Sequence, residues 1–252
     1  MLNGKKIIVV MPAYNAEKTL TQTIKEIPYG LVDEILLVDD QSSDRTVEVA
    51  KQISILTTIV HPKNLGYGGN QKTCYDEALK RGADVVVMLH PDYQYDPRLL
   101  LAMASPICFG VYDAMLGSRI LGGQAMKGGM PPIKYFMNRV TTFIFNLLYG
   151  TKLSEFHSGY RAFSTEVLTT IAYHQNSNDF VFDHECLAQL FYQEFRIGEV
   201  SCPARYFAEA SSIGFIRGSQ YLLSSFKVTL AFFKRKLNLG NHHPLFPTKR
   251  QS

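Results

Sequence analysis

The segment His90-Pro91-Asp92-Tyr93-Gln94 carries three side chains that could bind a divalent cation. It follows an apolar run typical of a strand, so residues 90, 92 and 94 would point the same way if the chain stayed extended. An imidazole nitrogen, a carboxylate and an amide oxygen can all act as metal ligands. An ordinary turn with an exposed histidine and aspartate has the same sequence pattern, and the spacing alone leaves both interpretations open.

Polar residues also end three other apolar runs, namely Pro12-Ala13-Tyr14-Asn15, Asp39-Asp40-Gln41-Ser42 and His61-Pro62-Lys63-Asn64. In open α/β sheets, ligands bind beyond the carboxyl ends of the strands, so we expect these four ends to meet on one rim. Asp, Asn and Pro are common in turns, and any single end could be only that. The four together favour a binding site.

The glycine-rich stretch at 64–70 could let backbone N–H groups approach a phosphate at a helix start. It follows the third apolar run and does not read GxGxxG, which disfavours a Rossmann dinucleotide site. The chain also contains no GxxxxGK[ST] motif, so it is not a P-loop ATPase.

The elements that must position these residues alternate along the first half of the chain. Apolar, β-branched runs predict strands at 5–14, 32–40, 56–62, 84–92 and 112–120. Helical spacing predicts helices between them at 16–27, 44–53, 69–81 and 97–104. Because the strands are apolar throughout, both sheet faces should be buried, which predicts an α/β fold with a mostly parallel sheet flanked by helices.

The second half is less regular. It begins with a glycine-rich loop at 122–132, and helical patterns follow at 134–148, 164–174, 183–195 and 220–237. A strand is expected at 196–207 and a loose tail after the last helix. The tail's histidine pair, His242 and His243, is too weak a signal for a metal site.

Composition limits the class of protein. The chain has 252 residues, 46% of them hydrophobic, which is enough for a substantial core, and its apolar runs are too short to span a membrane. Four widely spaced cysteines without a CxxC pair argue against a zinc ribbon or a disulfide scaffold and favour a reducing cytoplasm.

Charge is unevenly distributed. Residues 216–252 hold seven of the 26 Lys and Arg residues and none of the 22 Asp and Glu residues, so the rest of the chain is mildly acidic and nucleic-acid binding is disfavoured. The apolar helices predicted at 134–148 and 220–237 carry basic residues, and could lie on an anionic membrane surface. They could equally pack onto the core or form a homo-oligomer interface.

Six segments in this order resemble family 2 glycosyltransferases with the GT-A fold, and within them the branch of dolichyl-phosphate mannose and glucose synthases. They are PAYN-AEKTL from Pro12, VDDQSSDRT from Val38, NLGYGGNQ from Asn64, HPDYQYDP from His90, GSR from Gly117 and SEFHSGYRAFS from Ser154. The resemblance covers about residues 5–212. It implies a GT-A domain over 1–215 and a basic helical extension over 216–252.

The resemblance also implies roles on the donor side. Pro12, Ala13, Tyr14, Asp39 and Asp40 would form the nucleotide pocket, joined by Glu17 if the inserted Ala16 does not displace it. The turn containing Asn64, Gly66 and Gly69 would lie near the ribose. Asp92 and Gln94 would hold Mg²⁺ or Mn²⁺ against the diphosphate, where a metal neutralises the developing charge.

The chain departs from the family at His90, because the usual run in this branch is Asp-x-Asp-x-Gln. A neutral imidazole can still bind Mn²⁺ but suits Mg²⁺ poorly. Either Asp92 holds the metal, or His90 contacts the diphosphate directly, or metal dependence is weakened.

On the acceptor side the resemblance points to five catalytic candidates and to His157; the five are Arg119, Glu155, Arg161, Asp183 and Glu185. A polyprenyl phosphate acceptor is already ionised and needs arginine clamps, for which Arg119, Arg139 and Arg205 are candidates. A sugar hydroxyl would instead need a carboxylate base, for which Glu155, Asp183 and Glu185 are candidates. Arg161 and Glu185 could also be purely structural.

We therefore expect an inverting hexosyltransferase that uses a UDP- or GDP-linked sugar, with a polyprenyl phosphate or a glycan of the cell envelope as acceptor. Two alternatives remain. One is transfer to a saccharide hydroxyl, and the other is a catalytically degenerate protein that only binds nucleotide sugars. The expected location is the cytoplasm, with peripheral contact to the membrane left open.

Overall fold

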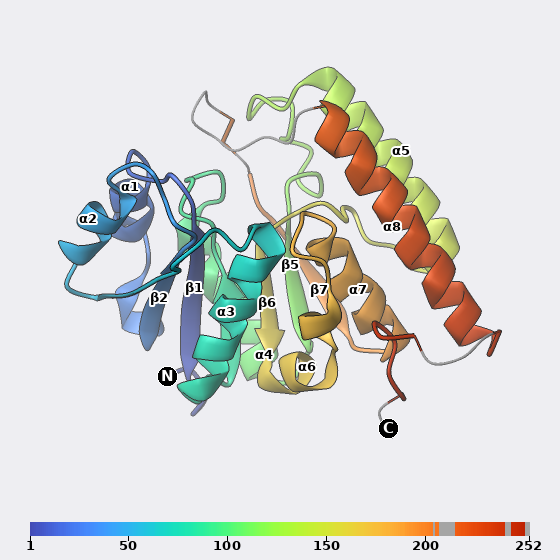
Figure 1. Cartoon of the computed structure of the whole chain (residues 1–252), viewed down its shortest axis with the longest axis horizontal. Helices are drawn as coiled ribbons and strands as arrows, with labels where there is room; N and C mark the ends of the chain where they lie inside the picture. Colours follow the sequence, from blue (N-terminus) through green and yellow to red (C-terminus); the bar gives the residue numbers. More distant parts are fainter. Residues whose placement is uncertain (204, 207–214, 240–242, 250–252) are drawn as a thin grey trace.

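A computed structural model of the chain describes residues 1–203, 205–206, 215–239 and 243–249, and it is built around a seven-stranded sheet (Figure 1). The strand order is β3-β2-β1-β4-β6-β5-β7. The strands are β1 (Ile7–Ala13), β2 (Glu34–Asp39), β3 (Leu56–Val60), β4 (Val85–Met88), β5 (Ala114–Ser118), β6 (Arg161–Ser164) and β7 (Ile197–Ser201).

The sheet is parallel except at β6, which runs antiparallel to both of its neighbours, β4 and β5. The carboxyl ends of the other strands and the start of β6 therefore lie along one edge. The mostly parallel α/β prediction is confirmed. Strand β6 was not predicted, because it has four residues and interrupts the strand–helix alternation on which the sequence reading depended.

Helices cover both faces of the sheet, and short 3-10 turns occur at Tyr29–Leu31, Pro97–Leu99 and Tyr173–Gln175. The helices are α1 (Leu20–Lys25), α2 (Thr46–Lys51), α3 (Tyr67–Lys80), α4 (Leu100–Cys108), α5 (Pro132–Tyr149), α6 (Thr165–Thr170), α7 (Phe182–Tyr192) and α8 (Phe215–Lys236). Each predicted helix is present, with bounds that differ by a few residues at the ends.

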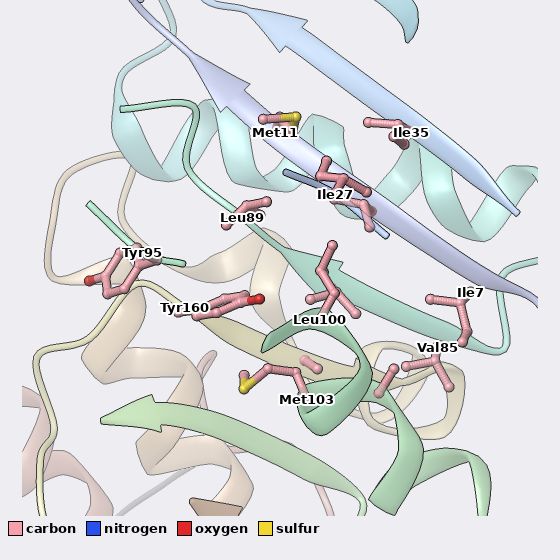
Figure 2. Packing of buried hydrophobic residues seen from close by; sticks show 14 of the residues in the cluster. Ile7, Met11, Ile27, Ile35, Val85, Leu89, Tyr95, Leu100, Met103 and Tyr160 are labelled. Atoms are coloured by element: carbon pink, nitrogen blue, oxygen red, sulfur yellow. The ribbon is translucent and has the colours of Figure 1, made fainter. Parts of the chain in front are cut away.

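The core is divided by the sheet because successive side chains of β1 alternate between its faces. Ile7, Val9 and Met11 pack with α1 and α4, whereas Ile8 and Val10 pack with α3, α6 and α7. Figure 2 shows residues of the first of these clusters, among them Met11, Leu89, Leu100 and Tyr160. Every residue of β1 is buried, which confirms the two-sided burial that its composition predicted.

Helices α5 and α8 lie side by side beyond α7 (Figure 1). Phe145 and Tyr149 of α5 contact Phe226 and Phe232 of α8, with ring centroids 5.3 and 4.9 Å apart, respectively. The Tyr149 hydroxyl also lies 2.8 Å from Oγ1 of Thr229. Because α8 packs on α5 and α7, it is joined to the sheet domain by core contacts, and the boundary at residue 215 stays a prediction.

The tail differs from expectation. Residues 243–249 are packed rather than loose: Phe246 is fully buried against Tyr192 and Phe232. Residues 240–242, including His242, and 250–252 lie outside the described part of the chain. All four cysteines are buried and unpaired. Within the described residues, no helix is both long and apolar enough to cross a membrane.

Candidate active site

The rim at the ends of β1, β2 and β3 is held together by two buried aspartates. Asp39 accepts hydrogen bonds from the backbone N–H of Ser42 at 2.9 Å and from its hydroxyl at 2.5 Å. The Asp40 carboxylate lies 2.8 Å from Nδ1 of His61, which follows β3. These strand ends therefore lie together, as predicted. Asp39 and Asp40, the two aspartates predicted to contact the nucleotide, also hold the rim in shape.

Asp40 positions the glycine-rich turn. Its two carboxylate oxygens accept the backbone N–H groups of Leu65 and Gly66 at 2.8 and 2.9 Å, and Asn64 donates to its carbonyl at 2.9 Å. Gly66 has φ +83°, and a Cβ there would lie 2.7 Å from the carbonyl oxygen of Asn178. Glycine is required here, because a side chain would be both strained and obstructed.

The end of β1 contributes one exposed aromatic side chain. Pro12 and Ala13 are buried in the strand, whereas Tyr14 is 57% exposed on the rim. Beside it, Asn15 accepts a hydrogen bond from Ser43 at 2.9 Å, and Glu17 accepts one from the backbone of Arg45 at 2.9 Å. Both contacts tie the start of α1 to the loop before α2.

The candidate metal segment does not stay extended. Residues 91 and 92 form a turn and Tyr93 has φ +58°, so the geometry that would align residues 90, 92 and 94 by simple alternation is absent. Gln94 is buried, and its backbone N–H donates to the Asp92 carboxylate at 3.1 Å. The expected alternation of residues 90, 92 and 94 is therefore wrong, because β4 ends at Met88 and the chain turns at residues 91–92.

The described residues contain no cluster of three or more His, Cys, Asp or Glu side chains that could hold a metal ion. Of the predicted ligands, Asp92 is the only carboxylate. With a single carboxylate, this segment suits only an ion that takes most of its ligands from substrate phosphates and water.

His90 is joined through Tyr67 to Asp183, one of the predicted acceptor-side residues. The Tyr67 hydroxyl donates to Oδ2 of Asp183 at 2.7 Å and lies 3.3 Å from Nε2 of His90, with the two rings stacked. Gly159 closes the other side, since a Cβ there would approach Nε2 of His90 to 2.7 Å. The first turn of α7 and the end of β4 thus share one site.

The sequence alone predicted no role for Tyr67, although the residue lies in the segment NLGYGGNQ. Its partner Asp183 is 116 residues away along the chain, so only the folded structure shows the pair.

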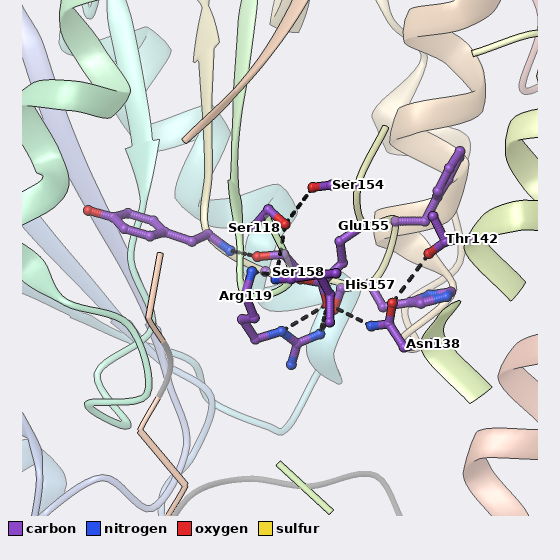
Figure 3. Close-up of polar contacts among 12 residues, drawn as sticks. Ser118, Arg119, Asn138, Thr142, Ser154, Glu155, His157 and Ser158 are labelled. Carbon is purple, nitrogen blue, oxygen red and sulfur yellow. Dashed lines mark hydrogen bonds and ion pairs between the residues drawn. The ribbon is translucent and has the colours of Figure 1, made fainter. Parts of the chain in front are cut away.

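Arg119 and Glu155 form a buried ion pair (Figure 3). Glu155 accepts the Arg119 backbone N–H at 2.8 Å, two guanidinium N–H groups, and Nδ2 of Asn138 at 2.8 Å. Burial alone would raise the pKa of Glu155, but the Arg119 charge and hydrogen bonds hold that pKa below its usual range. A carboxylate stabilised in this way is a poor proton acceptor, which argues against Glu155 as a general base.

Arg161 is also structural in its contacts. It is almost fully buried and donates to the backbone carbonyls of Ser158, Phe156 and Asp183. It therefore fixes the segment before β6 and the first turn of α7. A structural role of this kind was one of the two roles that the sequence left open for Arg161.

Glu185 accepts the backbone N–H of Ser177 at 2.7 Å, and burial raises the pKa of its carboxyl group. His157, which is partly buried, lies 2.9 Å from the Tyr221 hydroxyl of α8 and 2.8 Å from Oγ1 of Thr141. Burial lowers the pKa of His157 to about 4, so the ring is neutral at physiological pH.

The other two candidate arginines differ in location. Arg139 is exposed on α5 and donates to the carbonyl of Ser154 at 2.9 Å. Arg205 is partly exposed beside the metal segment: its guanidinium lies 4.1 Å from the Tyr93 ring centroid and 3.1 Å from Asp96. Of the three candidate phosphate clamps, Arg205 is the one beside the 90–94 turn.

The sequence pattern of the family described as glycosyl transferase family 2 matches residues 8–171, more than half of the chain and all of the rim. The chain belongs to this family. It is therefore a glycosyltransferase, and the resemblance stated from the six segments is confirmed.

Two relatives match most of their own length. An uncharacterized protein of Methanocaldococcus jannaschii is 28% identical over 94% of both chains. The UDP-N-acetylglucosamine–dolichyl-phosphate N-acetylglucosaminyltransferase of Methanococcus voltae is 28% identical over 80% of this chain and 86% of its own. The low-salt glycan biosynthesis hexosyltransferase Agl6 of Haloferax volcanii is 32% identical over 65% of this chain and 39% of its own.

Solved structures show the same fold. Glucosyl-3-phosphoglycerate synthase from Mycobacterium tuberculosis, in complex with Mn²⁺, UDP and phosphoglyceric acid, superposes with a TM-score of 0.66 and 18% identity, over 94% of this chain and 80% of that one. The UDP complex of the same enzyme gives 0.69, over 91% and 80%. The glycosyltransferase described here therefore has the GT-A fold.

Proposed function

We propose that this glycosyltransferase moves a sugar from a UDP-linked donor to a polyprenyl phosphate, with inversion at the anomeric carbon. The observation that carries the proposal is the buried Arg119–Glu155 pair, because it occupies a carboxylate that could otherwise activate a hydroxyl acceptor. The donor base is inferred from the relative that is named for a UDP-sugar and from the UDP complexes of the structural neighbours.

The acceptor is inferred from two observations. The Methanococcus voltae relative, similar along most of both chains, is named for dolichyl phosphate. In addition, one of the three carboxylates that could activate a hydroxyl, Glu155, is occupied by a buried arginine. An ionised phosphate acceptor needs no base, so positioning by a cation such as Arg205 suffices.

In the proposed reaction an acceptor phosphate oxygen attacks the anomeric carbon in line with the bond to the diphosphate. The new carbon–oxygen bond forms as the old one breaks, and UDP leaves with the bonding electron pair. Asp92 is the residue that would hold a divalent ion together with the diphosphate, and such an ion would neutralise charge on the leaving group. His90, hydrogen-bonded to Tyr67, would orient the turn beside it.

Transfer to a sugar hydroxyl is the second candidate, and Asp183 is the residue that favours it. Its carboxylate is in the first turn of α7, 13% exposed, and accepts hydrogen bonds from Tyr67 and Gln71. A carboxylate at the site could accept a proton from a hydroxyl. Asp183→Asn would then abolish turnover, whereas transfer to a phosphate would survive that change.

The first test is calorimetric titration of UDP, GDP, CDP and dTDP, with and without Mn²⁺, into wild type and Asp92→Ala. The proposal predicts that UDP binds best, that Mn²⁺ tightens its binding, and that Asp92→Ala removes the Mn²⁺ effect. Glu48→Ala, which removes an exposed carboxylate on α2, is the matched control and should bind as wild type does.

The second test is turnover with a UDP-sugar and a short-chain polyprenyl phosphate, followed by NMR assignment of the anomeric configuration. Retained configuration would overturn the inverting mechanism. Binding of UDP without turnover on phosphate or hydroxyl acceptors would instead support a degenerate, binding-only protein.

A further inference from the structure

Helix α5 has the reverse of the usual polarity for a surface helix. Its core-facing side includes Asn138, Thr141 and Thr142, all buried, whereas apolar side chains project outward from the opposite side. The outward residues are Ile133, Phe136, Met137, Val140, Phe143 and Leu147, at helical spacing, with Phe143 and Leu147 69% and 74% exposed. A helix whose outer side faced only water would carry its polar residues there.

Helix α8 continues the same surface. Ser225 and Thr229 are buried, whereas Leu223, Phe226 and Leu230 are exposed. Phe226 contacts Phe145 of α5, and the two helices run side by side (Figure 1). The exposed apolar residues of both helices, the six of α5 and these three of α8, together form what we call the α5–α8 face. Exposed apolar side chains on two packed helices indicate an interaction site.

The charged side chains of α5 and α8 themselves all have one sign. Neither helix contains Asp or Glu, and α8 carries exposed Lys227 and Lys234 one and four residues after Phe226 and Leu230, respectively. These two lysines and Arg235 line a hollow of about 260 Å³ that Leu230 and His243 share. Cationic groups next to an apolar face match the phosphates and acyl chains of an anionic lipid surface.

We propose that the α5–α8 face docks the enzyme onto an anionic membrane surface, with Lys227, Lys234 and Arg235 receiving lipid phosphates. A second copy of the chain fits less well, because a two-fold interface through this face would bring together only like charges. This inference rests on the proposed function, because an enzyme that uses a polyprenyl phosphate must reach its acceptor in a membrane.

The position of the face agrees with that role. Asn138, on the inner side of α5, donates to Glu155, which in turn holds Arg119. Lys134, in the first turn of α5, lies 5.3 Å from the Tyr206 ring centroid, and the Tyr206 hydroxyl accepts from Arg119 at 3.1 Å. The helix that would contact lipid therefore also borders the candidate acceptor side.

The test is co-sedimentation of the full chain with vesicles of phosphatidylcholine alone and of equimolar phosphatidylcholine and phosphatidylglycerol. We expect binding to the anionic vesicles only. The double variants Phe143→Glu/Leu147→Glu and Lys227→Glu/Lys234→Glu should each weaken binding about tenfold or more, because each removes apolar burial or charge attraction. Phe109→Glu/Val111→Glu, a matched change at exposed residues following α4, should have no effect.

Calorimetric UDP binding checks that each variant is folded. Unchanged vesicle binding by Phe143→Glu/Leu147→Glu would overturn the proposal. So would a wild-type dimer in light scattering that this variant dissociates, since a second copy would then cover the face. Vesicle binding requires no turnover, so loss of transfer activity with intact binding would refute the proposed function and leave the docking surface standing.

Discussion

The hydroxyl of Tyr67 lies between Oδ2 of Asp183, at 2.7 Å, and Nε2 of His90, at 3.3 Å. The residue is at the first position of α3, directly after the glycine turn that Asp40 holds. One side chain therefore connects the glycine turn, the residue His90 after β4 and the first turn of α7. A change at Tyr67 should disturb the reacting groups without disturbing the nucleotide rim.

Tyr67→Phe should lower kcat about 10- to 100-fold and leave UDP binding unchanged. The hydrogen bond that it removes goes to a charged carboxylate, and such bonds contribute about 1.5–3 kcal/mol. Steady-state kinetics with calorimetric Kd values would measure both quantities. Tyr29→Phe removes a hydroxyl far from the site and serves as the control. An unchanged kcat in Tyr67→Phe would remove the contact from the mechanism.

Gly66→Ala should weaken nucleotide binding and destabilise the protein by about 1–3 kcal/mol. The substitution places a side chain at φ +83° and against the Asn178 carbonyl, so the turn must shift away from Asp40. Urea unfolding and UDP titration report the two effects. Gly30→Ala is the matched control, because a Cβ there meets nothing within 4 Å and φ is ordinary. Equal behaviour of the two variants would contradict this account of the turn.

Glu155→Gln should cost about 3–5 kcal/mol of unfolding free energy, because it leaves the Arg119 guanidinium buried without its counter-charge. Chemical denaturation measures the loss. Lys80→Ala, which breaks an exposed pair with Glu77, should change stability by less than about 1 kcal/mol. If Glu155→Gln abolished turnover but kept wild-type stability, Glu155 would have to be a catalytic base after all.

His90→Asp should make nucleotide binding more dependent on Mg²⁺. A second carboxylate near Asp92 gives the hard oxygen ligand that Mg²⁺ prefers over imidazole. Titration of UDP at increasing Mg²⁺ concentration measures the change. His90→Asn has a similar size without the negative charge and separates charge from shape. The interpretation fails if both variants respond to Mg²⁺ alike.

Stability should fall as the pH drops below about 6.5, and His184 should contribute to that fall. Burial lowers the pKa of His184 from 6.5 to about 3, so the unfolded chain takes up a proton that the folded chain does not. The contribution is up to about 1.4 kcal/mol for each pH unit between these values, and stability rises again as pH increases.

His184→Phe should flatten that pH dependence with little loss at neutral pH. The ring packs 4.5 Å from Phe145, its Nδ1 has no hydrogen-bond partner among the residues that the structure describes, and the Tyr149 hydroxyl keeps its contact with Thr229. Thermal unfolding at a series of pH values tests it. His174→Phe, at an exposed histidine, is the control. A slope in His184→Phe as steep as that of wild type would assign the effect to other groups, such as His157.

The parallel sheet and its polar rim could be predicted because they depend on local pattern. The apolar run 7–13, buried on both faces, and the polar residues after each strand are properties of short segments. So is the glycine turn, where Gly66 adopts a backbone conformation that few other residues tolerate. Those patterns, taken in order, were also sufficient to indicate the family.

Only the tertiary structure decided what the candidate side chains are paired with. Glu155 and Arg119 were both predicted to be catalytic, but they neutralise each other in a buried pair between residues 36 positions apart in the sequence. Tyr93 has a positive φ, so the side chains of the candidate metal segment do not alternate as expected. The reversed polarity of α5 likewise depends on which side of the helix meets the core. The charge and accessibility of a group depend on its burial and on its long-range partners. Neither of these can be read from residue type and spacing along the chain.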